Sequence, residues 1–214
     1  MRTWPKEPLA QNFAHHNNFI RSATLRNGDA MHPRYLMATA AVATLTVCSA
    51  AAQDLDARPS WYVQAGKGES SSYALVLGTT MPWKNWQWNL GSGKVRGHWD
   101  AWVGAWSNQG LDRDRFTTPA LGIGPSLRWR GAQGTAAWFV EAGTAVMVTG
   151  KRLVNSGERM GTRFNFASHI GFGVNFGAQH AQELSLRLQH ASNAGIKDPN
   201  PGLDLVQIRY ALAF

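Results

Sequence analysis

The sequence has a single cysteine, Cys48, and no apolar run long enough to cross a membrane as a helix. One cysteine cannot form a disulfide within the chain, so packing and hydrogen bonds must hold the fold. A membrane-spanning helix needs about 20 mainly apolar residues, which excludes this class of membrane protein. The histidine, cysteine and acidic residues show no metal-ligand spacing, and no glycine-rich phosphate loop lies between a strand and a helix. We therefore expect neither a metal nor a cofactor.

Acidic residues are also scarce. The chain has 13 Asp and Glu against 21 Lys and Arg, which gives a formal net charge of +8. A positive surplus favours partners that carry many negative charges. Because the N-terminal features described next predict export, and exported chains rarely meet nucleic acid, we expect a phosphate-bearing lipid surface as partner and no nucleic acid.

The N-terminal region has the three parts of a secretory signal peptide. A basic start at Met31 is followed by a short apolar run, Tyr35 to Val47, and by the small residues Ser49 to Ala52. We expect cleavage after Ala52. The alternative is lipoprotein processing at Cys48, but the preceding valine is bulkier than such a site prefers.

These features divide the chain into three parts. Met31 is expected to be the true start, because a signal peptide normally lies at the very N-terminus. The predicted parts are an upstream extension outside the fold at 1–30, the signal peptide at 31–52 and one mature domain at 53–214.

Apolar and polar residues alternate with a period of two through the mature region, which is the pattern of β-strands. Eight strands are predicted, and eight is the smallest common strand number of an outer-membrane barrel. Their expected positions are Trp61–Lys67, Tyr73–Met81, Val95–Ser107, Thr118–Arg130, Ala136–Thr149, Thr162–Gly177, Gln182–Ser192 and Leu203–Phe214.

The alternation also indicates which face meets lipid. In the sixth predicted strand Phe164, Ile170 and Phe172 share one face, and His169 shares the other with glycines. Large apolar residues outside and small or polar residues inside are typical of a small membrane barrel, as are tryptophans near strand ends and a final alternating strand that closes on Phe214. We predict an all-β fold, an eight-stranded antiparallel transmembrane β-barrel of the bacterial outer membrane. A soluble lipocalin-like barrel or a β-sandwich is the competing fold.

The connections between the predicted strands differ in charge. With both barrel termini in the periplasm, the connections that face outside carry Arg113, Arg115, Lys151, Arg152, Arg159 and Lys197. These cations would face the phosphates of lipopolysaccharide. On the periplasmic side, we expect short connections except around Pro82–Lys94.

Three residues with the chemistry of a hydrolytic triad share one face of the last two strands. His190 and Ser192 are two residues apart and project the same way, and Asp204 opens the next, antiparallel strand with outward parity. Serine can then attack, histidine can accept its proton, and the carboxylate can orient the imidazole. The alternative is that these residues are ordinary interfacial hydrogen-bonding groups. His98 and His169 are expected in the lumen or the interfacial girdle.

The segment from His190 to Asp204 resembles the C-terminal motif of the PagL-type lipid A 3-O-deacylase family, through H-x-S-N-A followed by P-N-x-G. The resemblance implies an eight-stranded outer-membrane barrel that hydrolyses the ester-linked acyl chain at position 3 of lipid A. It implies His190 as base, Ser192 as nucleophile and Asp204 as acid, although the family acid is typically glutamate. It also implies that Asn200, with backbone N–H groups near Asn193 and Gly195, stabilises the oxyanion.

The sequence thus predicts a serine esterase of the outer membrane whose substrate is lipid A in lipopolysaccharide, with the site at the outer leaflet. Outer-membrane lipid is the expected surroundings, and a homodimer is left open. Two other functions compete. One is a non-enzymatic small barrel, an adhesin or structural protein. The other is an acyltransferase that moves a phospholipid chain onto lipid A, which would need an acyl pocket in the lumen.

Overall fold

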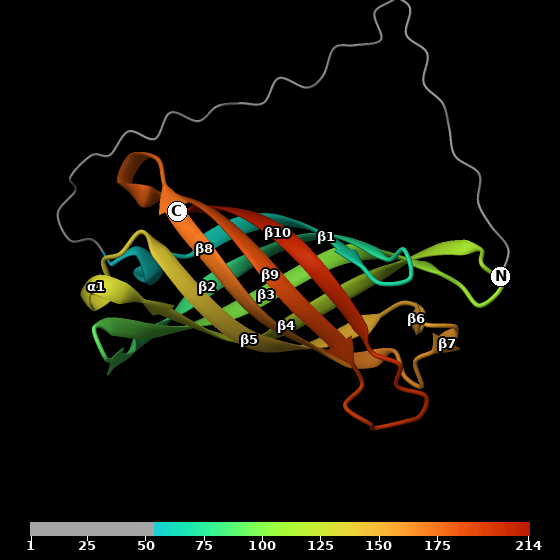
Figure 1. Ribbon diagram of the computed structural model, residues 1–214. Coiled ribbons are helices and arrows are strands. Elements are labelled where there is room, and N and C mark those ends of the chain that lie inside the picture. Colours follow the sequence, from blue (N-terminus) through green and yellow to red (C-terminus); the bar gives the residue numbers. More distant parts are fainter. Residues whose placement is uncertain (1–53) are drawn as a thin grey trace, which may run out of the picture. The chain divides into compact units, whose positions relative to one another are not determined.

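The computed structural model describes residues 54–214 (Figure 1). The predicted upstream extension and signal peptide lie outside the described residues, so the proposed division of the N-terminal region stays a prediction. Within 54–214, no helix has the length and apolar character that a membrane crossing requires.

Eight strands form one closed barrel in the order β1-β10-β9-β8-β5-β4-β3-β2, and every neighbouring pair is antiparallel. All eight predicted strands are present. Their bounds are β1 Ser60–Gly68, β2 Tyr73–Leu90, β3 Gly93–Gln109, β4 Arg115–Arg130, β5 Trp138–Thr149, β8 Phe164–Phe176, β9 Gln182–Ser192 and β10 Leu203–Ala213. The short elements are η1 Leu55–Ala57, α1 Gly131–Gly134, β6 Val154–Asn155, β7 Glu158–Arg159 and η2 Ala178–His180.

The two ends of the barrel carry different connections. One end, here termed the loop end, has the connections 69–72, 110–114, 150–163 and 193–202. The other, termed the turn end, has 91–92, 131–137 and 177–181, together with η1 and the end of β10. The connections around 131–137 and 177–181 are short, as predicted.

The prediction of a long connection around Pro82–Lys94 is wrong. β2 continues to Leu90 and β3 begins at Gly93, so the two strands form one long hairpin with a register shift between Pro82 and Gln87. Residues 84–90 are exposed on both faces. Trp86, Trp88 and Leu90 in fact alternate with polar residues, but Pro82 and the positive φ of Asn85 interrupt the pattern, so the strand was predicted to end at Met81.

Side chains alternate across the barrel wall in the sense expected for a membrane protein. On β9, Leu184, Leu186 and Leu188 are about half exposed on the outside, whereas Ser185 and Arg187 are buried inside. A soluble barrel would bury the leucines instead. The predicted inside-out distribution of polarity is therefore confirmed, and the competing soluble folds are not supported.

Ion pairs fill much of the lumen. Asp100 accepts hydrogen bonds from Arg187 at 3.1 Å, Arg209 at 3.0 Å and the Tyr62 hydroxyl at 2.5 Å. Toward the turn end, Arg128 lies between two carboxylates, donating to Glu141 and Glu183. Buried charges are tolerated only when paired and hydrogen-bonded, so this network fixes how the strands face one another across the lumen.

The segment before β1 closes the turn end. Asp56, in η1, accepts hydrogen bonds from the guanidinium of Arg130 at 2.7 and 3.0 Å, and its backbone carbonyl contacts His98. Burial raises the pKa of the Asp56 carboxyl, but the hydrogen bond from Arg130 and the charges of Arg128 and Arg130 outweigh burial and hold this pKa below its ordinary value. The N-terminal turn is thus bound to the barrel interior by charge.

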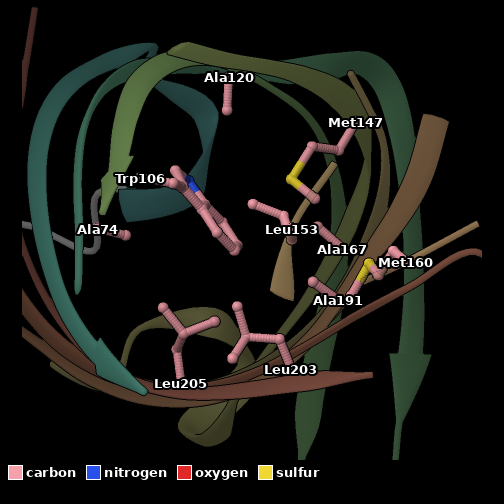
Figure 2. Close-up of a cluster of buried hydrophobic side chains, with 10 residues drawn as sticks. All are labelled: Ala74, Trp106, Ala120, Met147, Leu153, Met160, Ala167, Ala191, Leu203 and Leu205. Atoms are coloured by element: carbon pink, nitrogen blue, oxygen red, sulfur yellow. The ribbon is translucent and has the colours of Figure 1, made fainter. Parts of the chain in front are cut away.

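Apolar side chains close the loop end (Figure 2). Leu153 and Met160, from the connection between β5 and β8, are fully buried there together with Trp106, Leu203 and Leu205. The connection therefore folds back into the barrel mouth, and its β6–β7 hairpin is anchored by its own side chains. The rim that carries the predicted catalytic residues is built on this apolar cluster.

Candidate active site

His190 on β9 and Asp204 on β10 are direct register partners, and their side chains lie exposed on the outer wall near the loop end. The His190 Nδ1 and Asp204 Oδ1 atoms are 2.6 Å apart, in hydrogen-bond contact. Side chains of register partners in an antiparallel pair start about 4.5–5.5 Å apart at Cβ, so a short carboxylate spans the gap. The aspartate reaches the imidazole even though it is one methylene shorter than glutamate.

Ser192, the last residue of β9, follows His190 on the same face and is half buried. In the described part of the chain, no hydrogen bond joins the Ser192 hydroxyl to His190. Catalytic hydrogen bonds are often long before substrate binds. The Nδ1 contact with Asp204 leaves Nε2 as the atom that can receive a proton.

Gly202 lies beside the imidazole on the side of the loop, a proximity that the sequence did not reveal. A Cβ atom at this position would lie 2.9 Å from His190 Cε1, and the residue has a φ of +68°. Both facts require glycine here. The only sequence signal was a Pro-Gly pair, which is equally typical of an ordinary turn.

The loop after Ser192 is held by its two asparagines. The backbone N–H of Asn193 donates to Asn200 Oδ1 at 2.9 Å, and the backbone N–H of Gly195 donates to Asn193 Oδ1 at 3.0 Å. The buried Asn193 also donates from Nδ2 to the carbonyl of Lys197 at 2.6 Å. Both backbone groups that the resemblance connects with an oxyanion are therefore engaged within the loop. Since Oδ1 of Asn200 accepts, its Nδ2 remains a hydrogen-bond donor.

An apolar groove of about 780 Å³ lies beside this pair on the outer wall. Ile170, Leu188 and Val206 line it on three adjacent strands, and each is more than half exposed. His190 and Asp204 lie two register positions nearer the loop end, on the same face. A lipid chain in the groove would therefore run from the membrane interior to the candidate catalytic residues.

The remaining histidines lie elsewhere. His98 and His169 are buried in the lumen, on the opposite face of the wall from His190, as predicted. Among residues 54–214, no three histidine, cysteine or acidic side chains come close enough to hold a metal ion.

Fold and site together define a class: a β-barrel with an apolar outer wall that carries a His–carboxylate pair and a neighbouring serine on its lipid-facing side. The model of one protein family, described as lipid A 3-O-deacylase (PagL), matches residues 72–213. The chain therefore belongs to this family, and it is an outer-membrane β-barrel hydrolase.

Individual relatives agree with this assignment. A protein of Pseudomonas aeruginosa named lipid A deacylase PagL is 28% identical over 177 residues, which cover 83% of this chain and 95% of that protein. A protein of the same name from Bordetella bronchiseptica is 39% identical over 90 residues, covering 42% of this chain and 47% of that protein. A crystal structure described as the outer-membrane enzyme PagL superimposes with a TM-score of 0.60 at 26% identity, covering 72% of this chain and 99% of that chain.

Proposed function

We propose that this protein hydrolyses the ester that links a 3-hydroxyacyl chain to position 3 of lipid A, with Ser192, His190 and Asp204 as its catalytic triad. The observation that carries the proposal is the 2.6 Å contact between His190 and Asp204 on the lipid-facing wall, two residues from Ser192. Membership in a family of this activity supports the substrate.

The reaction follows from the roles of the three residues. Ser192 Oγ attacks the ester carbonyl carbon while His190 Nε2 takes its proton, and Asp204 stabilises the resulting imidazolium. When the tetrahedral intermediate collapses, the C–O bond to the sugar breaks and His190 returns the proton to the sugar oxygen. Water then attacks the acyl-serine with His190 again as base, and the products are the free hydroxy fatty acid and regenerated Ser192.

The developing oxyanion needs a donor near Ser192. Asn200 Nδ2 can supply one hydrogen bond, while the bonds of Asn193 and Gly195 hold the loop that carries Asn200 in place. A positioned donor of this kind is typically worth about 10²–10³-fold in rate. These three residues are thus proposed as oxyanion and support residues.

The loop end is proposed to face the outer leaflet. Its two longest connections are the 14-residue connection 150–163 and the ten-residue catalytic loop 193–202, whereas the turn-end connections have two to seven residues and both ends of the barrel chain lie at that end. Outer-membrane barrels have longer extracellular loops and short periplasmic turns. This orientation places Ser192 where ester groups of outer-leaflet lipid A lie.

The alternatives are less compatible with the structure. Transfer of a phospholipid chain would need an acyl pocket in the lumen, but the lumen is occupied by paired charges such as Arg187 with Asp100 and Arg128 with Glu141. A purely structural barrel would give no reason for an aspartate hydrogen-bonded to a histidine on a lipid-facing wall, where charged groups are unfavourable.

Mass spectrometry of lipid A incubated with the purified full chain in detergent tests the proposal. The parent should release one 3-hydroxy fatty acid per lipid A, and Ser192→Ala should release none. Ser168 is the matched control, because it is a serine exposed on the same outer wall and is the register partner of His190 on β8. Ser168→Ala should retain at least a tenth of the parental rate. Equal activity of Ser192→Ala and parent, or loss in Ser168→Ala alone, would refute the assignment.

A further inference from the structure

A second feature of the loop end lies outside the triad. Residues 150–163 form an anchored connection in which Leu153 and Met160 are fully buried, and the Met160 N–H donates to the Leu153 carbonyl at 2.8 Å. The neighbours of these two anchors, Arg152 and Arg159, are exposed. Burial of the anchors therefore holds two arginines on the outer side of the same short hairpin.

These arginines share a pocket with a third cation. A cavity of about 260 Å³ is lined by Phe116, Lys151, Arg152 and Arg159. The Lys151 backbone N–H donates to Thr118 Oγ1 at 2.7 Å, which fixes the start of the connection against β4. The Lys151 ammonium lies 5.7 Å from the centre of the Phe116 ring.

The charge of this pocket is uncompensated. Its lining contains no carboxylate, and within residues 54–214 none of its three cations forms a salt bridge. Three positive charges held around one concavity repel one another, and they favour an anion in the middle. Guanidinium groups in addition match the geometry of phosphate oxygens.

The pocket is connected to the candidate active site. The Gly161 N–H, from the connection that carries the cations, donates to the Pro199 carbonyl of the catalytic loop at 2.7 Å. β5, β8 and β9 are adjacent in the barrel. Ser192 is level with Phe166 and Val146, four residues before Gly150, so at about 4.8 Å per strand and 3.4 Å per residue the start of the cationic connection lies roughly 17 Å along the wall from the end of β9. A lipid with a sugar headgroup can extend over such a separation.

We propose that Phe116, Lys151, Arg152 and Arg159 form a binding site for a phosphate group of lipid A, which positions the headgroup while the ester lies at Ser192. This inference rests on the proposed function for the identity of the lipid. The site would select phosphorylated lipid A over lipid A without phosphate, and it would act on binding and not on the chemical step.

Binding measurements in an inactive background test the site without depending on turnover. In Ser192→Ala protein, the Kd for phosphorylated lipid A and for enzymatically dephosphorylated lipid A in detergent micelles would be compared. The expected ratio of the two Kd values is at least tenfold. Adding Lys151→Gln, Arg152→Gln and Arg159→Gln together should bring the ratio close to one. In the active enzyme, the same triple change should raise KM for phosphorylated lipid A at least fivefold and change kcat little.

A second triple variant, Arg58→Gln, Lys84→Gln and Lys94→Gln, removes the same charge toward the turn end and should keep the parental ratio. Circular dichroism, and the difference in electrophoretic mobility between heated and unheated protein, establish whether each variant is folded. A parental Kd ratio in the pocket variant would overturn the phosphate site, as would an equal fall in the control variant. Absence of fatty acid release by the parent would instead refute the proposed function and leave the Kd comparison decisive for the site.

Discussion

Replacing Gly202 with alanine should disable the candidate site while the barrel stays folded. The new Cβ would lie 2.9 Å from His190 Cε1, whereas carbon atoms in good contact are about 3.5–4.0 Å apart. The imidazole must therefore move by roughly 0.6–1 Å. Its other side is held by the Asp204 carboxylate at 2.6 Å, so the ring can yield only by changing the direction of Nε2.

The size of the effect follows from this displacement. A shift of about 1 Å in a catalytic group can cost about 10²-fold in rate, equivalent to about 2.7 kcal/mol of transition-state stabilisation. The positive φ of +68° adds a cost of about 1–2 kcal/mol to folding, because alanine has a Cβ that glycine lacks. We expect kcat to fall about 10²-fold with KM nearly unchanged.

Gly157→Ala is the matched control. Gly157 has a φ of +78°, and a Cβ there would have no atom within 4 Å. This variant should lose about the same 1–2 kcal/mol of stability and retain parental activity. Release of hydroxy fatty acid from lipid A gives kcat and KM, and thermal unfolding gives stability. A folded Gly202→Ala protein with parental kcat, or an equal kcat loss in Gly157→Ala, would refute the steric argument.

Three further predictions concern other positions. Asp204→Asn should keep the barrel and lose about 10²–10⁴-fold in kcat, since an amide cannot stabilise imidazolium, whereas Asp204→Glu should retain substantial activity; fatty acid release measures both. Asp56→Ala should destabilise the folded protein by about 3–5 kcal/mol at pH 7 by leaving Arg130 unpaired. Because the folded pKa of Asp56 is lowered, its stabilisation is present above about pH 4 and is lost as pH falls through the folded value, so the Tm difference between parent and variant should shrink there. N-terminal sequencing of the outer-membrane form should begin at Gln53; a lipid on Cys48 or a start upstream of Met31 would contradict this.

The strands could be predicted from the sequence because the two faces of the wall meet different environments. β9 shows why: each leucine outside has a polar neighbour inside, so burial and sequence share one period. The same reasoning placed Asp204 opposite His190, since sequential antiparallel strands joined by one loop must bring these positions together. The positions of the strands could therefore be predicted wherever one face of a strand meets lipid.

Contacts that depend on the whole barrel could not be read in this way. The pairing of Arg209 with Asp100 joins strands far apart in sequence, and its choice of partner depends on strand tilt and closure. The contact of Gly202 with the imidazole likewise depends on the path of a loop that has no periodic pattern. That Leu153 and Met160 turn inward could not be predicted either, because the three apolar residues of this polar connection, Leu153, Val154 and Met160, follow no period.

The charged filling of the lumen has a kinetic consequence. With Arg128, Arg187 and Arg209 occupying the interior, substrate can meet the protein only from the side, while both remain in the leaflet. Encounter is then a two-dimensional event, governed by lateral diffusion and by the mole fraction of substrate among its neighbours. The rate of such an enzyme depends on the surface concentration of its substrate in the leaflet and not on a concentration in water. Its fatty acid product is released into the same leaflet.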